Sequence, residues 1–389
     1  MRTPEIFHKH QYALNQVTLL QSGAPFFTRL LQLLGQAQTT IHMQYYIVDL
    51  DHTGGQVLQA LQAAAARGVQ VFLLVDAYAS AHITTQQLRI LATYGIKAKR
   101  FSPLKTKKGY GLGRRMHHKI CWVDGHTSLI GGINLADKYS GYQGKQPWLD
   151  FAVEVSGPAC TDVLKVCEEL LPNKWMRHIE QPNITLPPGA SLSRISQNDW
   201  LRNKAEISRS YRHAIRTSST SLLIVASYFL PGNRMRRLIK AAAKRGVKVT
   251  VVLGGVSDVP LMKSAVTYLY DWLLRNNITI YEWQPSVLHA KLAIVDEEWV
   301  TIGSYNLNAL SDYGSLELNV EVQDAHFAKT TTHHLQQLID EGCKKIEQQE
   351  YLRHKNWYLQ LWRWFSYKLL RLSLRLFFLV MQGRKPSSM

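Results

Sequence analysis

The chain has 389 residues, of which 46% are hydrophobic, so it can bury the core of one duplicated domain or of two ordinary domains. Its 46 Lys and Arg against 28 Asp and Glu give a net charge of +18, which favours an anionic partner, either nucleic acid or an acidic lipid surface. The composition excludes a low-complexity chain, and four scattered cysteines exclude a disulfide framework or a zinc site.

We expect no secretory signal at the start of the sequence. Its first twenty residues contain no apolar run followed by a small-residue cleavage site. Together with the unpaired spacing of the cysteines, this predicts a reducing, cytoplasmic setting.

An internal repeat organises most of the sequence. Residues 39–76 and 220–255 share one order of patterns, namely an apolar strand, a turn, an amphipathic helix, Arg-Gly-Val and a second apolar strand. In the first copy the helix pattern covers residues 55–68 and ends at Gly68, a residue that favours helix C-termini. The second strand of each copy is almost continuously apolar, as is typical of strands covered on both faces. We therefore predict an α/β fold of two pseudo-symmetric α-β-α halves, each with a parallel or mixed sheet between helices.

The two halves are separated by residues 172–199, which are rich in Pro, Asn and Ser and show no sustained period. We place the boundary near residue 185. The first half is then 1–185, the second half is 186–350, and 351–389 form a tail of different composition.

Each half also contains one copy of a polar motif. Its pattern is His-x-Lys, four residues, Asp, six residues, Gly, a small residue, one further residue and Asn. The first copy supplies His117, Lys119, Asp124 and Asn134, and the second copy supplies His289, Lys291, Asp296 and Asn306. A single His-x-Lys could be surface decoration, but two complete copies at matching places of a duplicated chain indicate a site.

The tandem histidines of the first motif are not equivalent. An apolar strand follows each Lys, and side chains alternate between the faces of a strand. His117 therefore shares a face with Lys119, as His289 does with Lys291, whereas His118 is predicted to point to the other face.

The residue types indicate a phosphate site. A lysine is a poor metal ligand at neutral pH but a good partner for a phosphoryl oxygen, and the amides of Asn134 and Asn306 can donate without adding charge. If the halves face each other, one imidazole can attack phosphorus while the other protonates the departing oxygen. We expect Asp150 and Glu321 to orient the histidines from equivalent places in the two halves, with the competitors Glu154 and Glu317 less favoured for this role. The four acidic candidates for orienting the histidines are therefore Asp150, Glu321, Glu154 and Glu317.

The doubled motif resembles that of the phospholipase D superfamily, over residues from about 25 to 345. Within it the chain is most similar to bacterial cardiolipin synthases of the short type, on the motif ends "GGIN" and "GSYN", the element "WLDFAVEVSGP" and the turn "ASYFLPG". The resemblance implies that both motifs meet in one cleft, that a covalent phosphatidyl-histidine forms, and that no metal or other cofactor is needed. By the same analogy Asp124 and Asp296, although counted with the catalytic motifs, support the motif's structure more than they touch substrate.

The tail is predicted to be a membrane device. Residues 355–385 contain three tryptophans and no acidic residue. On a helical projection the cations gather on one side and the apolar residues on the other, as in a helix that lies in the membrane interface. Arginines interrupt every window long enough to span a bilayer. The alternative is a helix that is docked on the protein's own surface. The two projected sets are Arg363, Lys368, Arg371 and Arg375 against Leu359, Trp362, Phe365, Leu369, Leu376, Phe377 and Val380.

These patterns predict a phosphatidyl transferase, peripheral on the cytoplasmic face of a bacterial cell membrane, whose partners are an anionic phospholipid and the membrane surface. One phosphatidylglycerol or a similar phospholipid donates to a motif histidine and releases glycerol or another head group, and a second phosphatidylglycerol accepts to give cardiolipin. Motif spacing leaves open which histidine is the nucleophile and whether water is the acceptor, which would make the protein a hydrolase. A phosphodiesterase acting on nucleic acid and a membrane scaffold with a vestigial site are the further alternatives.

Overall fold

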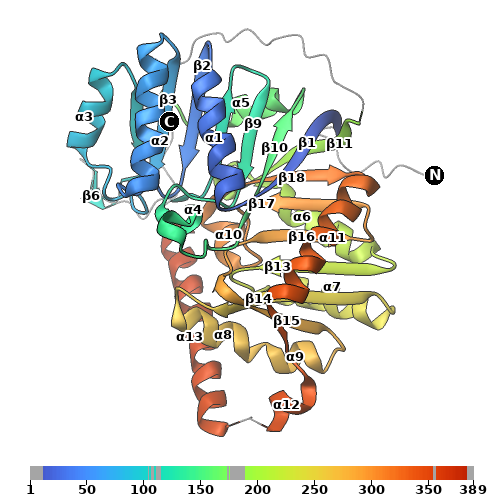
Figure 1. Ribbon diagram of the computed structural model, residues 1–389. Coiled ribbons are helices and arrows are strands. Elements are labelled where there is room, and N and C mark those ends of the chain that lie inside the picture. The colour runs from blue at the N-terminus through green and yellow to red at the C-terminus, as the bar shows by residue number, and fades with distance from the viewer. Residues whose placement is uncertain are drawn as a thin grey trace.

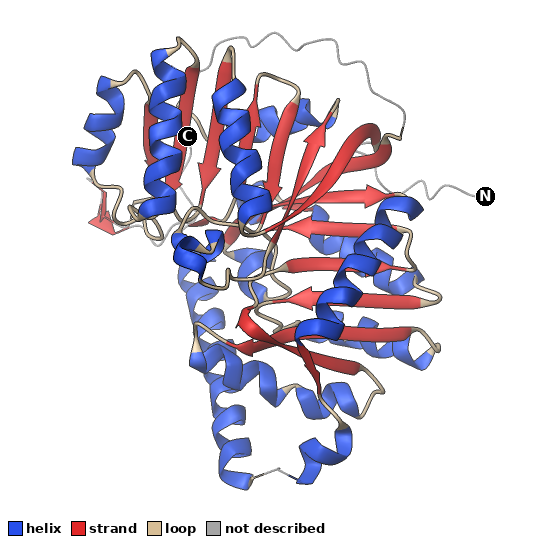
Figure 2. Cartoon of the chain, in the orientation of Figure 1, coloured by secondary structure: helices blue, strands red, loops and turns tan. Residues whose placement is uncertain are grey.

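The strands of both halves join in one continuous sheet (Figures 1 and 2). The computed structural model describes residues 12–103, 105–106, 109–110, 115–172, 175, 189–353 and 356–382, and for 105–106, 109–110 and 374–382 it describes the backbone alone. Among these residues the main sheet has 17 strands. The first-half strands are β1 (Ala13–Gln21), β2 (Thr40–Tyr45), β3 (Gln70–Asp76), β4 (Lys97–Phe101), β7 (Arg115–Met116), β8 (Lys119–Val123), β9 (Thr127–Gly131) and β10 (Phe151–Ser156), with β5 (Lys105–Thr106) and β6 (Gly109–Tyr110) forming a separate hairpin. The second-half strands are β11 (Ser191–Asp199), β12 (Lys204–Ala205), β13 (Ser221–Ala226), β14 (Lys248–Val256), β15 (Thr279–Val287), β16 (Lys291–Val295), β17 (Trp299–Gly303), β18 (Ser315–Gln323) and β19 (Cys343–Lys345).

Helices cover both faces of this sheet. In the first half α1 and α2 lie on one face and α5 on the other, and in the second half α11 lies across the strands opposite α6 and α7 (Figure 1). The first-half helices are α1 (Ala24–Gln36), α2 (His52–Ala66), α3 (Thr85–Thr93), α4 (Asp137–Ser140) and α5 (Ala159–Glu168). The later helices are α6 (Glu206–Thr217), α7 (Asn233–Lys244), α8 (Pro260–Tyr268), α9 (Tyr270–Leu274), α10 (Ala309–Tyr313), α11 (Ala325–Gly342), α12 (Gln348–Arg353) and α13 (Trp357–Gln382).

The strand pairings show a two-fold repeat. In the first half the order from the edge is β4-β3-β2-β8-β9-β10-β1. In the second half the matching order is β15-β14-β13-β16-β17-β18-β11, with β19 added outside β15, and β1 pairs with β11 in the middle. The pairs within β4-β3-β2 and within β15-β14-β13 are parallel, and the other pairs of these two series are antiparallel, as is the added β15–β19 pair. The predicted α/β fold of two pseudo-symmetric halves is therefore confirmed, with the difference that the two sheets merge into one.

The repeated helix begins and ends as its residues dictate. α2 begins after Asp51, whose carboxylate accepts a hydrogen bond from the backbone N–H of Gly54 at 3.0 Å. It ends just before Gly68, which takes a left-handed φ of 92° that a residue with a side chain would rarely adopt. The predicted helix at 55–68 is thus present and begins three residues earlier than expected.

Two of the buried cores belong to one half each, and a third is shared. The first packs α1 and α2 on the sheet, and the second packs α6 to α9 on it. The third contains apolar side chains from both halves, among them Trp122, Val153, Leu292 and Val322. This shared core, with the β1–β11 pairing, holds the halves in a fixed relation.

The segment between the halves is more ordered than its composition predicted. Residues 191–199, placed in the irregular linker, form β11, a central strand between β1 and β18. The sequence did not predict this strand, because its side chains are mostly polar. They are nevertheless buried against polar partners, and Arg194, for example, is bound to Glu321. The expected boundary near residue 185 lies in 176–188, outside the described residues.

The carboxy-terminal helix α13 packs against the second half along one side of the molecule, in the lower left of Figure 1. Tyr367 is buried, its ring 4.9 Å from that of Tyr268 on α8. Arg236 donates to the Tyr367 hydroxyl. No helix within the described part of the chain has the length and apolarity to span a membrane.

Candidate active site

The two motif histidines are each fixed to the opposite half of the molecule. His117 follows β7, which pairs in parallel with the start of β18, and its backbone N–H donates to Leu316 at 3.0 Å. His289 follows β15, and its backbone N–H donates to Leu149 of the first half at 2.8 Å. The motifs therefore meet where the halves join, as the fold of this type requires.

Each imidazole also contacts a carboxylate of the other half. Nδ1 of His117 donates to Oε2 of Glu317 at 2.8 Å, and Nδ1 of His289 donates to Oδ2 of Asp150 at 2.5 Å. Both carboxylates are almost completely buried. Because Nδ1 is occupied, Nε2 is the ring atom left for a substrate in both histidines.

The expected orienting residue Glu321 does not contact a histidine, and Glu317 takes that place. Glu321 instead accepts hydrogen bonds from Arg194 at 2.8 and 3.0 Å and from Tyr12 at 3.2 Å. The expected pairing of Asp150 with Glu321 was wrong by four residues along β18. The segments at 150–155 and 317–322 both end in Val-Glu-Val, and this shared ending pairs Asp150 with Glu317.

The remaining pair of acids is structural in both halves. Glu154 is bound by Arg29 through two hydrogen bonds of 2.7 and 2.8 Å, as Glu321 is bound by Arg194. The corrected register thus separates two acids next to histidines from two acids next to arginines.

The two motif lysines lie beside the histidines and are fully buried. Nζ of Lys119 donates to the carbonyl oxygen of His117 at 2.7 Å and lies 5.0 Å from the centre of the Tyr46 ring. Nζ of Lys291 donates to the carbonyl oxygen of His289 and lies 3.6 Å from Oδ2 of Asp150. An ammonium placed next to each imidazole can hold an anionic oxygen between them.

The motif asparagines are buried and partly engaged. Asn134 accepts from the backbone N–H of Ile47 at 3.2 Å and donates to the hydroxyl of Tyr139 at 2.9 Å. Asn306 accepts from the hydroxyl of Ser227 at 3.3 Å. The carboxamide oxygens of both residues therefore accept hydrogen bonds from the protein, and the NH₂ group of Asn134 donates to Tyr139.

The motif aspartates lie away from the histidines. Asp124 follows the far end of β8 and accepts from the backbone N–H groups of residues 38, 39 and 40, just before and at the start of β2. Asp296 does the same for residues 219 to 221 at the start of β13. Both carboxylates fix the start of the repeated strand, which agrees with the structural role that the resemblance implied for them.

The tandem histidine His118 turns away from this site. Its ring is buried, and Nδ1 donates to Oε1 of Gln44 on β2 at 3.0 Å. Gln44 in turn donates to the carbonyl oxygen of Cys167 on α5. His118 therefore faces the side of the sheet that α5 covers, as the alternation of the strand predicted.

Burial shifts the titration of the central groups. It lowers the pKa of His117, although the charge of Glu317 opposes the shift. Burial and the nearby Lys291 hold the pKa of His289 well below its usual value, and burial likewise holds the pKa of Lys119 well below its own. Burial raises the pKa of Asp150 to about 6. Two lysines and two histidines therefore lie close together in a buried site, where a bound anion would stabilise their charged forms.

Aromatic rings line the site, and the sequence motifs did not point to them. Tyr46 lies edge-on to His117, with ring centres 4.8 Å apart. Tyr139, Trp148 and Tyr228 surround His289 at 5.3, 6.1 and 6.4 Å. A usable signal existed for Tyr46 and Tyr228, since both follow the first strand of the repeat. Among the described residues no group of three or more His, Cys, Asp and Glu side chains is arranged to hold a metal ion.

Comparison with known families decides the relationship. The family described as "Cardiolipin synthase, PLD-like domain" matches residues 30–145 and 211–339, more than half of the chain. The chain belongs to the phospholipase D superfamily. The two matched segments carry one His-x-Lys motif each, so the superfamily assignment and the internal repeat agree.

Several curated relatives share most of this superfamily member's length. Cardiolipin synthase B of Salmonella typhi is 31% identical over 342 residues, which cover 86% of this chain and 83% of the relative. Cardiolipin synthase A of Pseudomonas putida is 29% identical over 338 residues, which cover 84% of this chain and 69% of the relative. The solved structure of phosphatidylserine synthase from Haemophilus influenzae superposes with a TM-score of 0.75 at 16% identity, covering 95% of this chain and 96% of that one. That likeness supports the phospholipase D fold of both halves.

Proposed function

We propose that this protein is a cardiolipin synthase, which transfers a phosphatidyl group from one phosphatidylglycerol to a second and releases glycerol. The observation that carries the proposal is the pair of histidines at the junction of the halves, each with a carboxylate of the opposite half on Nδ1 and a buried lysine beside it. The relatives named cardiolipin synthase support a phospholipid as the substrate.

The first step forms the covalent intermediate. Nε2 of one histidine bonds to the phosphorus of phosphatidylglycerol, and the other histidine gives its proton to the glycerol oxygen as the P–O bond breaks. Glycerol leaves with that proton. The low pKa of both imidazoles supplies a neutral nucleophile, and the negative phosphodiester raises the pKa of the imidazole that must carry the proton.

The second step reverses these roles on a new alcohol. The histidine that lost its proton accepts one from a hydroxyl of the second phosphatidylglycerol, whose oxygen bonds to phosphorus as the P–N bond breaks. Lys119 and Lys291, with the amides of Asn134 and Asn306, stabilise the charge on the phosphoryl oxygens in both steps. Both histidines return to their starting states, and the product is cardiolipin.

The proposed contact with the membrane is the outer face of α13. Large apolar side chains on this helix are exposed, among them Leu361 at 56%, Phe365 at 47% and Leu372 at 54%. Lys368 lies 5.8 Å from the ring centre of Trp364, so the exposed side of the helix carries a cation among its apolar side chains, whereas the helical projection places Lys368 on the side opposite Phe365. The opposite side of the helix, around Tyr367, packs on the protein. We therefore propose that one side of α13 contacts the protein's own surface and the other side contacts the membrane. Arg375, Leu376, Phe377 and Val380 also belong to the projected sets, but the structure describes only their backbone.

Charge and thiol chemistry support the cytoplasmic leaflet as the site of action. The net charge of +18 complements an anionic leaflet, and all four cysteines are free. We place the protein as a peripheral enzyme on that leaflet of a bacterial cell membrane.

The test is product analysis on phosphatidylglycerol vesicles by mass spectrometry. We expect cardiolipin and glycerol in equal amounts. Phosphatidic acid without cardiolipin would make the protein a hydrolase, and cleavage of oligonucleotides with no lipid turnover would make it a nuclease. His117→Ala and His289→Ala should each lower the rate by roughly a thousandfold or more, and His118→Ala by no more than a few-fold. Turnover retained in either of the first two variants would refute the two-histidine mechanism.

A further inference from the structure

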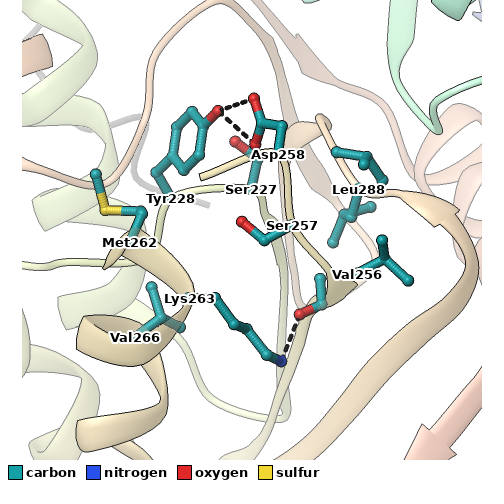
Figure 3. A pocket seen from close by; sticks show the side chains of 11 residues that line it. Ser227, Tyr228, Val256, Ser257, Asp258, Met262, Lys263, Val266 and Leu288 are labelled. Carbon is teal, nitrogen blue, oxygen red and sulfur yellow. Dashed lines mark hydrogen bonds between the residues drawn. The ribbon is translucent and has the colours of Figure 1, made fainter. Parts of the chain in front are cut away.

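A small pocket with both polar and apolar lining lies beside His289, at the ends of β13 and β14, and has room for about one water molecule. Tyr228 and Ser227 line it from the end of β13, Ser257 and Asp258 from the loop after β14, and Lys263 from α8. Figure 3 shows these side chains around one space, with the Tyr228 ring and the Asp258 carboxylate on the same side of it. None of these residues belongs to the two motifs.

The pocket adjoins the reacting groups. The Tyr228 ring lies edge-on to His289, with 6.4 Å between ring centres, and Leu288 of the pocket wall precedes that histidine. The hydroxyl of Ser227 donates to Oδ1 of Asn306 at 3.3 Å. Burial lowers the pKa of Lys291, and the negative charge of Asp258 is one of those that oppose this shift, so Asp258 acts within the same electrostatic site. A group bound in the pocket therefore lies within reach of the phosphorus that His289 serves.

The chemistry of the pocket differs from that of the phosphate site. The Tyr228 hydroxyl donates to both oxygens of Asp258, at 2.8 and 3.0 Å, and the side chain of Asp258 remains exposed. A carboxylate offers about four acceptor positions, so one hydroxyl does not exhaust it. Its negative charge repels a second phosphate and suits a neutral group that donates hydrogen bonds.

The first half differs at the end of β3, the strand that corresponds to β14. Asp76, which the repeat pairs with Gly254, is completely buried and accepts from the backbone N–H groups of Tyr78, Ala79 and Met116. Arg115 lies 3.4 Å from the same carboxylate. The exposed Asp258 is therefore not a copy of Asp76, and the two-fold repeat does not extend to this loop.

We propose that the mouth of this pocket, at Tyr228, Ser257 and Asp258, is the head-group subsite, in which the exposed Asp258 accepts hydrogen bonds from the hydroxyl groups of a glycerol head group. This inference rests on the proposed transferase function. The leaving and the entering oxygen take the same position on phosphorus, so one subsite serves the glycerol that departs and the glycerol of the lipid that accepts.

A polyol fits this lining better than an amine does. Hydroxyl groups both donate and accept, so they can use Asp258 as well as the hydroxyls of Ser227 and Ser257. An ammonium group only donates, and it would meet the ammonium of Lys263, which donates to the carbonyl oxygen of Gly254 at 2.7 Å and is bound to Glu282. The pocket therefore predicts a preference for glycerol over ethanolamine.

The experiment measures exchange of isotope-labelled glycerol into phosphatidylglycerol, alongside cardiolipin and phosphatidic acid, with the full-length protein. We expect Asp258→Asn to raise the glycerol concentration for half-maximal exchange about tenfold, because a hydrogen bond to a charged acceptor is lost. Its products should shift from cardiolipin toward phosphatidic acid, since water needs no head-group subsite. Tyr228→Phe, which keeps the carboxylate, should have a smaller effect in the same direction.

The matched control is Asp271→Asn on α9, a carboxylate of the same half paired with Arg275 on the surface, which should leave every parameter unchanged. If the wild type makes cardiolipin but Asp258→Asn keeps the wild-type glycerol dependence and product ratio, the subsite is wrong and the function stands. If labelled ethanolamine exchanges better than glycerol and depends on Asp258, the assignment to a polyol is wrong. If the wild type neither makes cardiolipin nor exchanges glycerol, the proposed function and the subsite fail together.

Discussion

Two acids four residues apart on β18 have separate tasks. Glu317 contacts His117 across the junction of the halves, while Glu321 is bound to the buried Arg194. Their side chains share one face of the strand, and only the position along it decides which cation or imidazole each one meets.

We therefore predict opposite consequences for the two amide variants. Glu317→Gln should lower kcat about a hundredfold or more, because the neutral amide no longer orients the imidazole of His117 through a hydrogen bond to a charged carboxylate. The charge of Glu317 raises the pKa of His117, so the acid limb of the kcat/KM profile should move to lower pH in this variant.

Glu321→Gln should instead destabilise the fold by roughly 3–5 kcal/mol, because Arg194 is left buried without its anion, while the folded enzyme keeps its kcat within a few-fold. Denaturant melts and steady-state rates on both variants check this. A large loss of kcat in Glu321→Gln with an unchanged melt would overturn the corrected register.

Lys119 is a residue whose burial disfavours the folded state. Its pKa lies well below the value in an unfolded chain because it is buried and close to Lys291. Between these two pKa values the unfolded chain binds more protons, so the wild-type protein gains stability as the pH rises through that window.

We predict that Lys119→Met raises the free energy of unfolding by roughly 1–4 kcal/mol at neutral pH and abolishes turnover. The gain should shrink as the pH approaches about 10.4, the pKa of lysine in the unfolded chain, because the wild-type lysine then becomes neutral in both states. Thermal melts from pH 6 to about pH 10 measure the start of this decline. Equal or lower stability of the variant at neutral pH would show that the ammonium of Lys119 is stabilised in the folded protein.

At the scale of single elements, α8 connects the pocket with the outer helix. Met262, Lys263 and Val266 of α8 line the pocket beside His289. On its other side Ser264 accepts from the indole N–H of Trp362, and Tyr268 packs on Tyr367 of α13. A membrane bound to α13 is therefore one helix away from the proposed head-group subsite.

We predict that the outer face of α13 controls membrane binding. Replacing Leu361, Phe365 and Leu372 together by Gln should lower the partition coefficient onto phosphatidylglycerol vesicles about a hundredfold, because three exposed apolar side chains no longer enter the interface. Tyr367 is kept, so the helix should remain docked. Vesicle sedimentation at several lipid concentrations measures the change.

The matched control replaces three exposed leucines elsewhere, Leu14, Leu192 and Leu201, whose exposed fractions are 52%, 43% and 46%. This triple variant should bind vesicles like the wild type. Equal losses in both triple variants would mean that apolar exposure in general, rather than α13, governs binding.

For the whole molecule the halves are incomplete without each other. Each histidine takes its carboxylate and a backbone hydrogen bond from the other half. The sheet is continuous through β1 and β11, and one core is shared. The repeated sequence thus encodes one site rather than two.

The charge of the whole chain predicts a dependence on salt. At a net charge of +18 the protein should be drawn to anionic vesicles, and exposed charges are screened beyond about 10 Å at 0.1 M salt. We expect the initial rate on dilute phosphatidylglycerol vesicles to fall several-fold between roughly 50 and 500 mM NaCl. The rate at saturating lipid should change little, because the site itself is buried. A rate independent of salt at low lipid would show that apolar contact alone recruits the protein.

The sequence alone was sufficient for the repeat, the α/β fold and the two motifs. Periodicity and spacing are local properties, so they can be read without knowing which segments meet. The orientation of His118 away from His117 follows from the two-residue period of a strand in the same way.

Only the tertiary structure decided which acids serve the histidines, that β11 is a central strand, and that α13 turns its apolar side outward. Each of these depends on contacts between segments more than a hundred residues apart, such as His117 with Glu317 and Arg194 with Glu321. The motif aspartates show the same limit, because Asp124 and Asp296 carry the pattern of a site and bind backbone instead. The role of a polar residue depends on the partner that it contacts in the folded protein, and that partner can lie far away in the sequence.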